Sequence, residues 1–224
     1  MITDVFFDLD HTLWDFERNS ALAFGKVFDK HGVMVSLDAF LSHYVPLNLQ
    51  YWERYRREEI TQSELRYGRL KDAFDLLAYD ISDEMIHTLS VAYIECLPEN
   101  NHLFDGALDI LSYLHAKYRL HIITNGFHEV QARKIVNSNI GHFFTTVTNS
   151  EMAGVKKPHP DIFDYALKLA NVDKRHCVMI GDCIDADVRG ALDFGIDAIW
   201  FNEDTLGVSD VKHVRRLTDL KKYL

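Results

Sequence analysis

Short apolar segments alternate with amphipathic ones in the second half of the chain. Apolar runs such as LHIITN (residues 120–125) and HCVMIGD (residues 176–182) have the length of strands that are buried on both faces. Helical periodicity separates these runs, and this alternation predicts an α/β fold with a parallel sheet covered by helices on both faces. We expect strands at residues 4–10, 120–125, 143–149, 176–182 and 197–201, and helices at residues 105–118, 128–138, 161–171, 186–194 and 217–224.

The stretch between the first expected strand and the alternating region has helical periodicity throughout. Thr61 is followed three residues later by Glu64, which is the capping-box pattern of a helix start. Ser82 precedes two acidic residues, as is typical of a helix N-terminus. We expect helices at residues 19–31, 36–58, 61–77 and 82–97.

This helical block interrupts the strand–helix alternation directly after the first strand. We therefore interpret residues 16–90 as an inserted all-α cap. Residues 1–15 and 91–224 then form the sheet-containing core.

Polar side chains gather where the expected strands end. In an open α/β sheet, ligands bind beyond the carboxyl ends of the strands. Residues from several parts of the sequence should therefore meet at that edge. The candidates are Asp8, Asp10, Thr124, Asn125, Lys156, Lys157, Asp182, Asp185 and Asp187.

Three of these acids predict a metal site. The two-residue period of a strand places Asp8 and Asp10 on one face, and Asp182 joins them from another strand end. A single aspartate after a strand is most often a turn or helix cap. Three converging carboxylates would take up protons unless a cation offset their charge, and Mg²⁺ prefers one or two carboxylates with water and phosphate oxygens.

The composition restricts the partners. A formal net charge of −10 disfavours binding to a nucleic-acid polymer, whereas a small anion needs only a few local positive groups. No apolar run is long enough to span a membrane, and the N-terminus lacks the basic region of a secretion signal. The 3 cysteines form no CxxC pair. We expect a cytoplasmic protein with a small-molecule partner, and leave open whether it is a monomer or a dimer.

Four segments, in this order, resemble the motifs of the haloacid dehalogenase superfamily. DLDHT (residues 8–12) is similar to its DxDx[TV] signature, and IITNG (residues 122–126) to its second motif. VKKPHPDIF (residues 155–163) resembles the third motif and GDCIDAD (residues 181–187) the fourth. The resemblance implies a Rossmann-like core, a helical cap and a phosphotransfer reaction through an aspartyl-phosphate.

The resemblance also implies roles for the acids. Asp8 would be the nucleophile, and Asp10 would protonate the leaving alcohol and then deprotonate water. Its pKa would be raised by Asp8 and by burial for that purpose. Mg²⁺ would be held by the side chains of Asp8 and Asp182 and by the backbone carbonyl of Asp10.

Further motif residues would hold the phosphoryl group. Thr124 and the backbone amide of Asn125 would bind its oxygens, and Lys157 would offset their charge. Asp187 would anchor Lys157 or a metal-bound water. Lys156 matches no motif position and is expected at the surface.

The cap segment YWERYRREEITQSELRYGRL (residues 51–70) and TNGF (residues 124–127) are similar to the pyrimidine 5′-nucleotidases of this superfamily. The implied substrates are nucleoside 5′-monophosphates. Trp52 and Tyr55 could stack on a base, or could simply pack between cap helices, and Phe127 could reach the substrate.

Other functions remain as alternatives. The dehalogenases of the superfamily lack the second aspartate, so Asp10 disfavours dehalogenation. A sugar-phosphate or phosphoglycolate-type phosphatase would use the same residues. A β-phosphoglucomutase-like phosphomutase is disfavoured by Thr12, where such mutases more often have valine. A catalytically silent binding module on the same fold is the non-enzymatic alternative.

Overall fold

The structure is a computed structural model that describes residues 1–203 and 210–224. The chain divides into two compact units. The first contains Met1–Phe16 and Asn101–Leu224, and the second contains Glu17–Asn100. No helix among the described residues combines the length and the apolar character that a bilayer crossing requires.

A parallel sheet of six described strands forms the centre of the first unit, in the order β3-β2-β1-β4-β5-β6. One of its two middle strands, DVFF, is completely buried. The strands are β1 (Asp4–Phe7), β2 (Arg119–Thr124), β3 (Phe144–Asn149), β4 (Cys177–Gly181), β5 (Asp197–Phe201) and β6 (Lys212–Val214).

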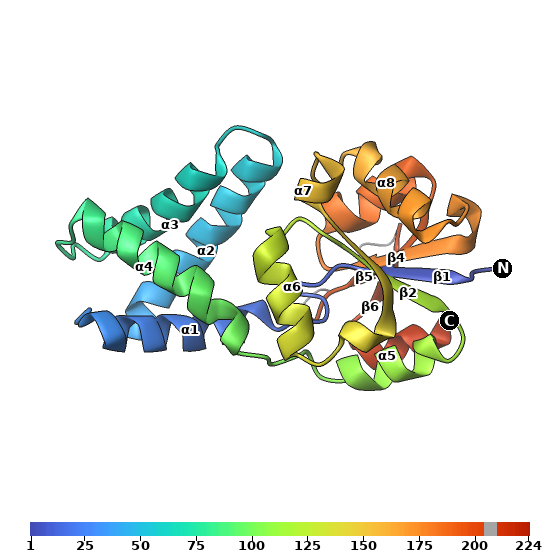
Figure 1. The fold of residues 1–224 in the computed structure, drawn as a ribbon, viewed down its shortest axis with the longest axis horizontal. Helices are drawn as coiled ribbons and strands as arrows, with labels where there is room; N and C mark the ends of the chain where they lie inside the picture. Colours follow the sequence, from blue (N-terminus) through green and yellow to red (C-terminus); the bar gives the residue numbers. More distant parts are fainter. Residues whose placement is uncertain (204–209) are drawn as a thin grey trace. The chain divides into compact units, whose positions relative to one another are not determined.

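Helices cover both faces of this sheet (Figure 1). The α-helices of the unit are α5 (Ala107–His115), α6 (His128–Asn137), α7 (Ser150–Ala153), α8 (Pro160–Ala170) and α9 (Gly190–Phe194). Short 3₁₀ segments are η2 (Gly141–Phe143), η3 (Lys174–His176) and η5 (Leu217–Lys222), and η4 (Ile184–Arg189) is a π-helix.

The alternation of side chains along the strands separates two apolar layers. Phe6 of β1 and Met179 of β4 belong to one buried cluster with residues of α8 and α9. On the other face lie α5 and η5 (Figure 1). Burial on both faces explains why the strands read as continuous apolar runs, and the predicted Rossmann-like α/β class is confirmed.

The strand order determines where a ligand can bind. β1 lies between β2 and β4. The chain adds β2 and β3 on one side of β1, and then β4, β5 and β6 on its other side. The crevice beyond the carboxyl ends of two such neighbouring strands is the usual ligand site of open α/β sheets. Asp8 directly follows β1 and Asp182 directly follows β4, so both residues lie at this crevice.

The second unit is all-helical, as expected. Thr61 and Glu64 form both hydrogen bonds of the predicted capping box, and the Ser82 hydroxyl accepts from the Met85 amide. Its core is a cluster of aromatic rings, in which Phe24 and Tyr93 stack at 4.2 Å between centroids. The helices are α1 (Phe16–His31), α2 (Leu37–Arg56), α3 (Gln62–Leu76) and α4 (Asp83–Cys96), followed by η1 (Leu97–Glu99).

Several boundaries differ from those expected. The expected cap limit at residue 90 falls inside α4, and the helical unit continues to Asn100 because α4 and η1 form one continuous stretch. The expected C-terminal helix is only the 3₁₀ segment η5. Strand β6 was not expected, because its three residues are too few to show a period.

Candidate active site

The first strand ends before both aspartates of the opening motif, and not at residue 10 as expected. Asp8 still donates its amide to the Ile180 carbonyl of β4 at 2.9 Å, which keeps it in register with the sheet. The chain then turns: the amides of Leu13 and Trp14 both bond to the Leu9 carbonyl, at 3.0 and 2.8 Å. Asp10 therefore lies on a turn, and the strand-period argument for its direction was wrong.

Lys157 lies at the centre of a buried ionic cluster. Its ammonium is 2.5 Å from Asp8 Oδ1 and 2.7 Å from Asp187 Oδ1, and it donates to the Ile123 carbonyl at 2.7 Å. These three oxygens match the three protons of an ammonium group. Burial lowers the pKa of Lys157, but Asp187 and Asp8 outweigh that effect and raise the pKa above its ordinary value. The lysine is therefore held as a cation directly beside Asp8.

The side chain of Asn125 holds the backbone of Lys157. Asn125 Nδ2 donates to the Lys157 carbonyl at 2.9 Å, and the Lys157 amide donates to Asn125 Oδ1 at 2.7 Å. This pair of bonds joins the end of β2 to the loop that carries the lysine. We expected only the backbone amide of Asn125 to act, and this positioning role of its side chain was missed.

Asp182 extends from the end of β4 into the same region. The Thr12 hydroxyl donates to Asp182 Oδ1 at 3.1 Å, and Trp200 Nε1 donates to its backbone carbonyl at 2.6 Å. Thr12 is completely buried. These contacts give the threonine of the first motif a definite role in orienting a carboxylate of the fourth.

Asp187 reaches the cluster from η4, a π-helix, which is a rare geometry often found at functional sites. Its Oδ2 accepts from the Cys183 amide at 3.0 Å, while its Oδ1 faces Lys157. A Cβ at Gly181 would lie 2.3 Å from Asp187 Oδ2, so only glycine leaves room for this carboxylate. Asp187 thus contacts Lys157 through Oδ1, as one of its two predicted roles requires, and its role as the anchor of Lys157 or of a metal-bound water stays a prediction.

The acids of this cluster fit a divalent cation. Carboxylate oxygens of Asp8, Asp182 and Asp187 all lie within 4.8 Å of one another. Burial raises the pKa of Asp8 well above its usual range despite the opposing Lys157. Burial and then Asp187 raise the pKa of Asp182 to about 7. Because these sites disfavour uncompensated negative charge, Asp8 and Asp182 are suitable ligands for Mg²⁺.

Two residues that the motifs did not indicate bind Asp10, and one of them, Gln131, also binds Thr124. Gln131 Nε2 donates to Asp10 Oδ2 at 2.9 Å and to Thr124 Oγ1 at 2.8 Å. Lys134 Nζ donates to Asp10 Oδ1 at 2.6 Å. Both residues lie on α6, three positions apart on one helix face. Two polar residues at that spacing were the available signal, but their burial could not be read from the sequence.

The three candidate specificity residues are Trp52 and Tyr55, whose rings contact each other, and Phe127, which is buried. On α2, the Trp52 and Tyr55 rings meet edge to face at 5.7 Å between centroids. Phe127 precedes α6 and is only 4% exposed. Their proposed contact with substrate stays a prediction.

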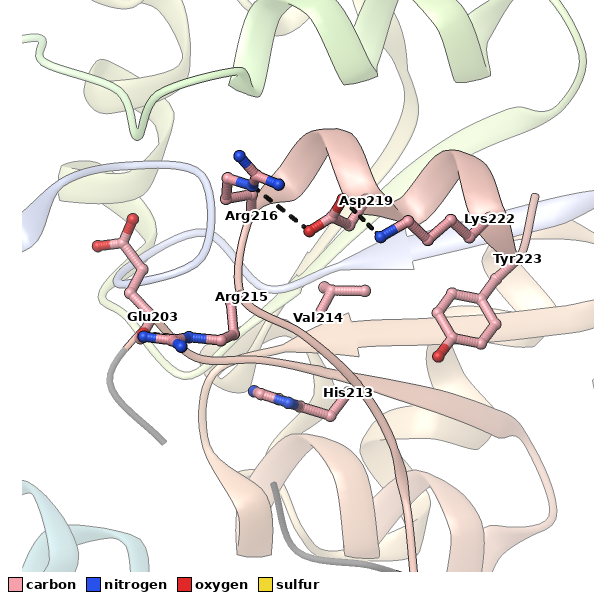
Figure 2. A pocket seen from close by; sticks show the side chains of 8 residues that line it. All are labelled: Glu203, His213, Val214, Arg215, Arg216, Asp219, Lys222 and Tyr223. Atoms are coloured by element: carbon pink, nitrogen blue, oxygen red, sulfur yellow. Dashed lines mark hydrogen bonds and ion pairs between the residues drawn. The ribbon is translucent and has the colours of Figure 1, made fainter. Parts of the chain in front are cut away.

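A separate hollow of about 580 Å³ lies over β6 and η5 (Figure 2). Arg216 and Lys222 both point toward Asp219, at 3.6 and 2.9 Å, and Arg215 donates to the Glu203 carbonyl. The described residues that line it include none of the aspartates of the ionic cluster. It therefore offers no nucleophile and acid of the kind found beyond β1 and β4.

Comparisons with known proteins show similarity along most of the chain. Pyrimidine 5′-nucleotidase YjjG of Escherichia coli is 29% identical over 225 residues, which cover 98% of this chain and 96% of that protein. Glyceraldehyde 3-phosphate phosphatase of Pyrococcus abyssi is 33% identical over 208 residues, covering 90% and 82%.

A solved structure of HAD-hydrolase YfnB from Bacillus subtilis, bound to magnesium, is similar over 100% of this chain and 98% of that one. Its TM-score is 0.89 and its identity 27%. The model of the haloacid dehalogenase-like hydrolase family matches residues 4–195, which include all four motifs and every member of the ionic cluster. The chain belongs to the haloacid dehalogenase-like hydrolases.

Proposed function

We propose that this hydrolase is a Mg²⁺-dependent phosphatase that cleaves small phosphomonoesters through an aspartyl-phosphate. The observation that carries the proposal is the buried Asp8–Lys157 pair beside Asp182, with Asp10 held by its own donors at the same end of the sheet. It combines a nucleophile, a fixed cation and a second carboxyl group for proton transfer.

In the first half-reaction, a carboxylate oxygen of Asp8 attacks phosphorus while the bond to the alcohol oxygen breaks. The leaving oxygen takes a proton from the Asp10 carboxyl group, and the phosphoryl group becomes attached to Asp8. Lys157 offsets the charge on the phosphoryl oxygens. The Thr124 hydroxyl and the Asn125 backbone amide hold those oxygens in place.

In the second half-reaction, a water molecule gives a proton to the Asp10 carboxylate and attacks phosphorus. The bond between phosphorus and Asp8 breaks and inorganic phosphate is released. Both aspartates then have their starting protonation states, so the cycle balances.

Asp8 and Asp182 would hold Mg²⁺ by their side chains, together with the backbone carbonyl of Asp10. When bound, the ion supplies positive charge that offsets both the carboxylates and the phosphoryl oxygens. Asp187 keeps Lys157 in position in this arrangement.

Nucleoside 5′-monophosphates are the substrates that we favour. The similarity to a pyrimidine 5′-nucleotidase over nearly the whole chain supports this choice. The helical unit would act as a specificity cap, with Trp52, Tyr55 and Phe127 as candidate contacts to the base.

Triose or other sugar phosphates are the second candidate class. The similarity to glyceraldehyde 3-phosphate phosphatase supports it, and the core chemistry would be the same. In a phosphomutase, the same residues would catalyse a different reaction. In a catalytically silent binding module, they would catalyse none.

The test is a substrate panel measured with Mg²⁺ and with EDTA. It ranks pyrimidine and purine nucleoside monophosphates, triose phosphates and p-nitrophenyl phosphate by kcat/KM, with Asp8→Asn as the inactive control. We expect Mg²⁺-dependent turnover with the pyrimidine nucleotides first. A higher rank for triose phosphates would refute the nucleotidase assignment alone, and equal inactivity of wild type and Asp8→Asn on all esters would refute the phosphatase.

We propose a cytoplasmic location and a small-molecule partner. All three cysteines are free thiols, which is typical of a reducing compartment. The oligomeric state, monomer or dimer, is left to a hydrodynamic measurement.

A further inference from the structure

Two buried side chains of α6 converge on Asp10, which the motif assigns to proton transfer. Gln131 is 1% and Lys134 2% exposed. Each binds a different carboxylate oxygen, Gln131 Nε2 at 2.9 Å from Oδ2 and Lys134 Nζ at 2.6 Å from Oδ1. With one donor on each oxygen, rotation of the carboxylate would break at least one hydrogen bond.

Lys134 is itself held firmly. Its ammonium lies 4.3 Å from the ring centroid of Trp14 and 5.2 Å from that of Phe16. Removing a charged amine from water is costly unless a partner compensates it. The Asp10 carboxylate and the two ring faces supply that compensation. An apolar side chain would pack between the helix and the turn without this desolvation cost, so the presence of Lys134 indicates a role beyond packing.

Gln131 also sets the direction of the Thr124 hydroxyl. Thr124 Oγ1 accepts from Gln131 Nε2 at 2.8 Å and from the Gly126 amide at 3.1 Å. A hydroxyl has two lone pairs and one proton, so these bonds occupy both lone pairs. The proton of Thr124 is left to donate to another group, such as an oxygen of an incoming phosphoryl group.

The glycine of the second motif makes this arrangement possible. A Cβ at Gly126 would lie 2.4 Å from both Cδ and Nε2 of Gln131. Any side chain at this position would push the amide away from Asp10 and Thr124. The motif glycine is thus matched to a glutamine five residues further along the chain.

We propose that Gln131 and Lys134 are positioning residues, which hold the proton-transfer carboxylate of Asp10 and the phosphate-binding hydroxyl of Thr124 in one fixed geometry. This inference rests on the proposed phosphatase function. Each Asp10 oxygen has a second lone pair, so both remain able to exchange a proton with a leaving group or with water.

The role predicts a dependence on the leaving group. An alkyl alcohol must be protonated as it leaves, whereas p-nitrophenolate leaves without a proton. Poor positioning of Asp10 should therefore slow phosphoryl transfer from an alkyl ester far more than from p-nitrophenyl phosphate. A general loosening of the fold, or a lower fraction of folded enzyme, would affect both esters alike.

The experiment measures kcat/KM for the best alkyl phosphate of the substrate panel and for p-nitrophenyl phosphate, and takes their ratio. Both values come from one enzyme preparation, so the folded fraction cancels. The variants are Gln131→Met and Lys134→Met, which keep side-chain length and remove the donors. Arg133→Met removes an exposed cation from the same helix as the matched control, and Asp10→Asn gives the full loss.

General acid catalysis contributes about 10²–10⁴-fold, so we expect the ratio to fall at least about tenfold in both α6 variants and to stay unchanged in Arg133→Met. A ratio within about threefold of wild type in Gln131→Met would overturn the proposal. This outcome is decisive even if Lys134→Met proves too unstable to measure. Failure of the phosphatase function is distinguishable, because wild type would then hydrolyse neither ester.

Discussion

Asp182→Asn should stabilise the metal-free protein at alkaline pH. Burial, with Asp187 next, raises the pKa of this carboxyl from 3.8 to about 7 in the folded state. The folded state therefore holds its proton more tightly than the unfolded chain does. Stability is highest below the unfolded pKa and is lost as the pH rises toward the folded pKa.

The shift gives the expected size of the effect. A rise of about three pKa units, at about 1.36 kcal/mol per unit, means that ionised Asp182 lowers the free energy of unfolding by about 4 kcal/mol above pH 7. Asp182 keeps partial contact with solvent, and screening reduces the expected gain in the variant to about 2–4 kcal/mol at pH 8. At pH 5 the folded state keeps Asp182 mostly protonated, so most of this destabilisation of wild type is absent. The variant should then be more stable than wild type by only about 1 kcal/mol. Asparagine keeps an oxygen that can accept from Thr12.

The assay is urea unfolding at both pH values, in EDTA and in Mg²⁺. Excess Mg²⁺ should stabilise wild type, by about 2.7 kcal/mol at a hundred times its Kd, and stabilise the variant much less. Asp185→Asn is the control, because the side chain of Asp185 is 74% exposed and faces Arg189. Destabilisation of metal-free Asp182→Asn at pH 8, or an equal Mg²⁺ effect on both proteins, would refute the reasoning.

Three further predictions follow from other contacts. Lys157→Met leaves the buried carboxylates of Asp8 and Asp187 without their cation, and should cost about 3–5 kcal/mol in urea unfolding; a loss below about 1 kcal/mol would contradict the buried ion pairs. Gly181→Ala places a methyl group 2.3 Å from Asp187 Oδ2, so kcat should fall at least about tenfold with no change in charge, and wild-type kcat would show that the glycine is dispensable. Burial lowers the pKa of His121 below 6.5, so neutral His121 contributes stability at pH values above 6.5, and this contribution is lost as the pH falls. The variant His121→Gln should therefore show a smaller fall in Tm than wild type between about pH 6.5 and 5. An equal fall in both proteins would exclude His121 as the source of the pH dependence.

Much of the catalytic core could be predicted because local sequence patterns encode it. Near-continuous apolar runs indicated buried parallel strands, and the carboxyl ends of such strands meet at one edge. Asp8 and Asp182 are adjacent for that reason alone. The capping box at Thr61 is equally local, since all its atoms lie within four residues.

Other features depended on packing between distant segments. The first strand ends at Phe7 because the following residues form a turn around the Leu9 carbonyl, and apolar periodicity does not mark that point. The side chain of Asn125 binds the backbone of Lys157, 32 positions away. Such partners cannot be assigned from either segment separately.

By itself, the sequence determined which residues carry charge and which strand ends present them, because side-chain chemistry and strand periodicity are local properties. Only the tertiary structure decided that Gln131 and Lys134 meet Asp10, more than 120 positions earlier in the chain. A hydrogen bond requires its atoms to lie within about 3 Å. Periodicity shows that a helix face is buried, but only packing determines what lies opposite it.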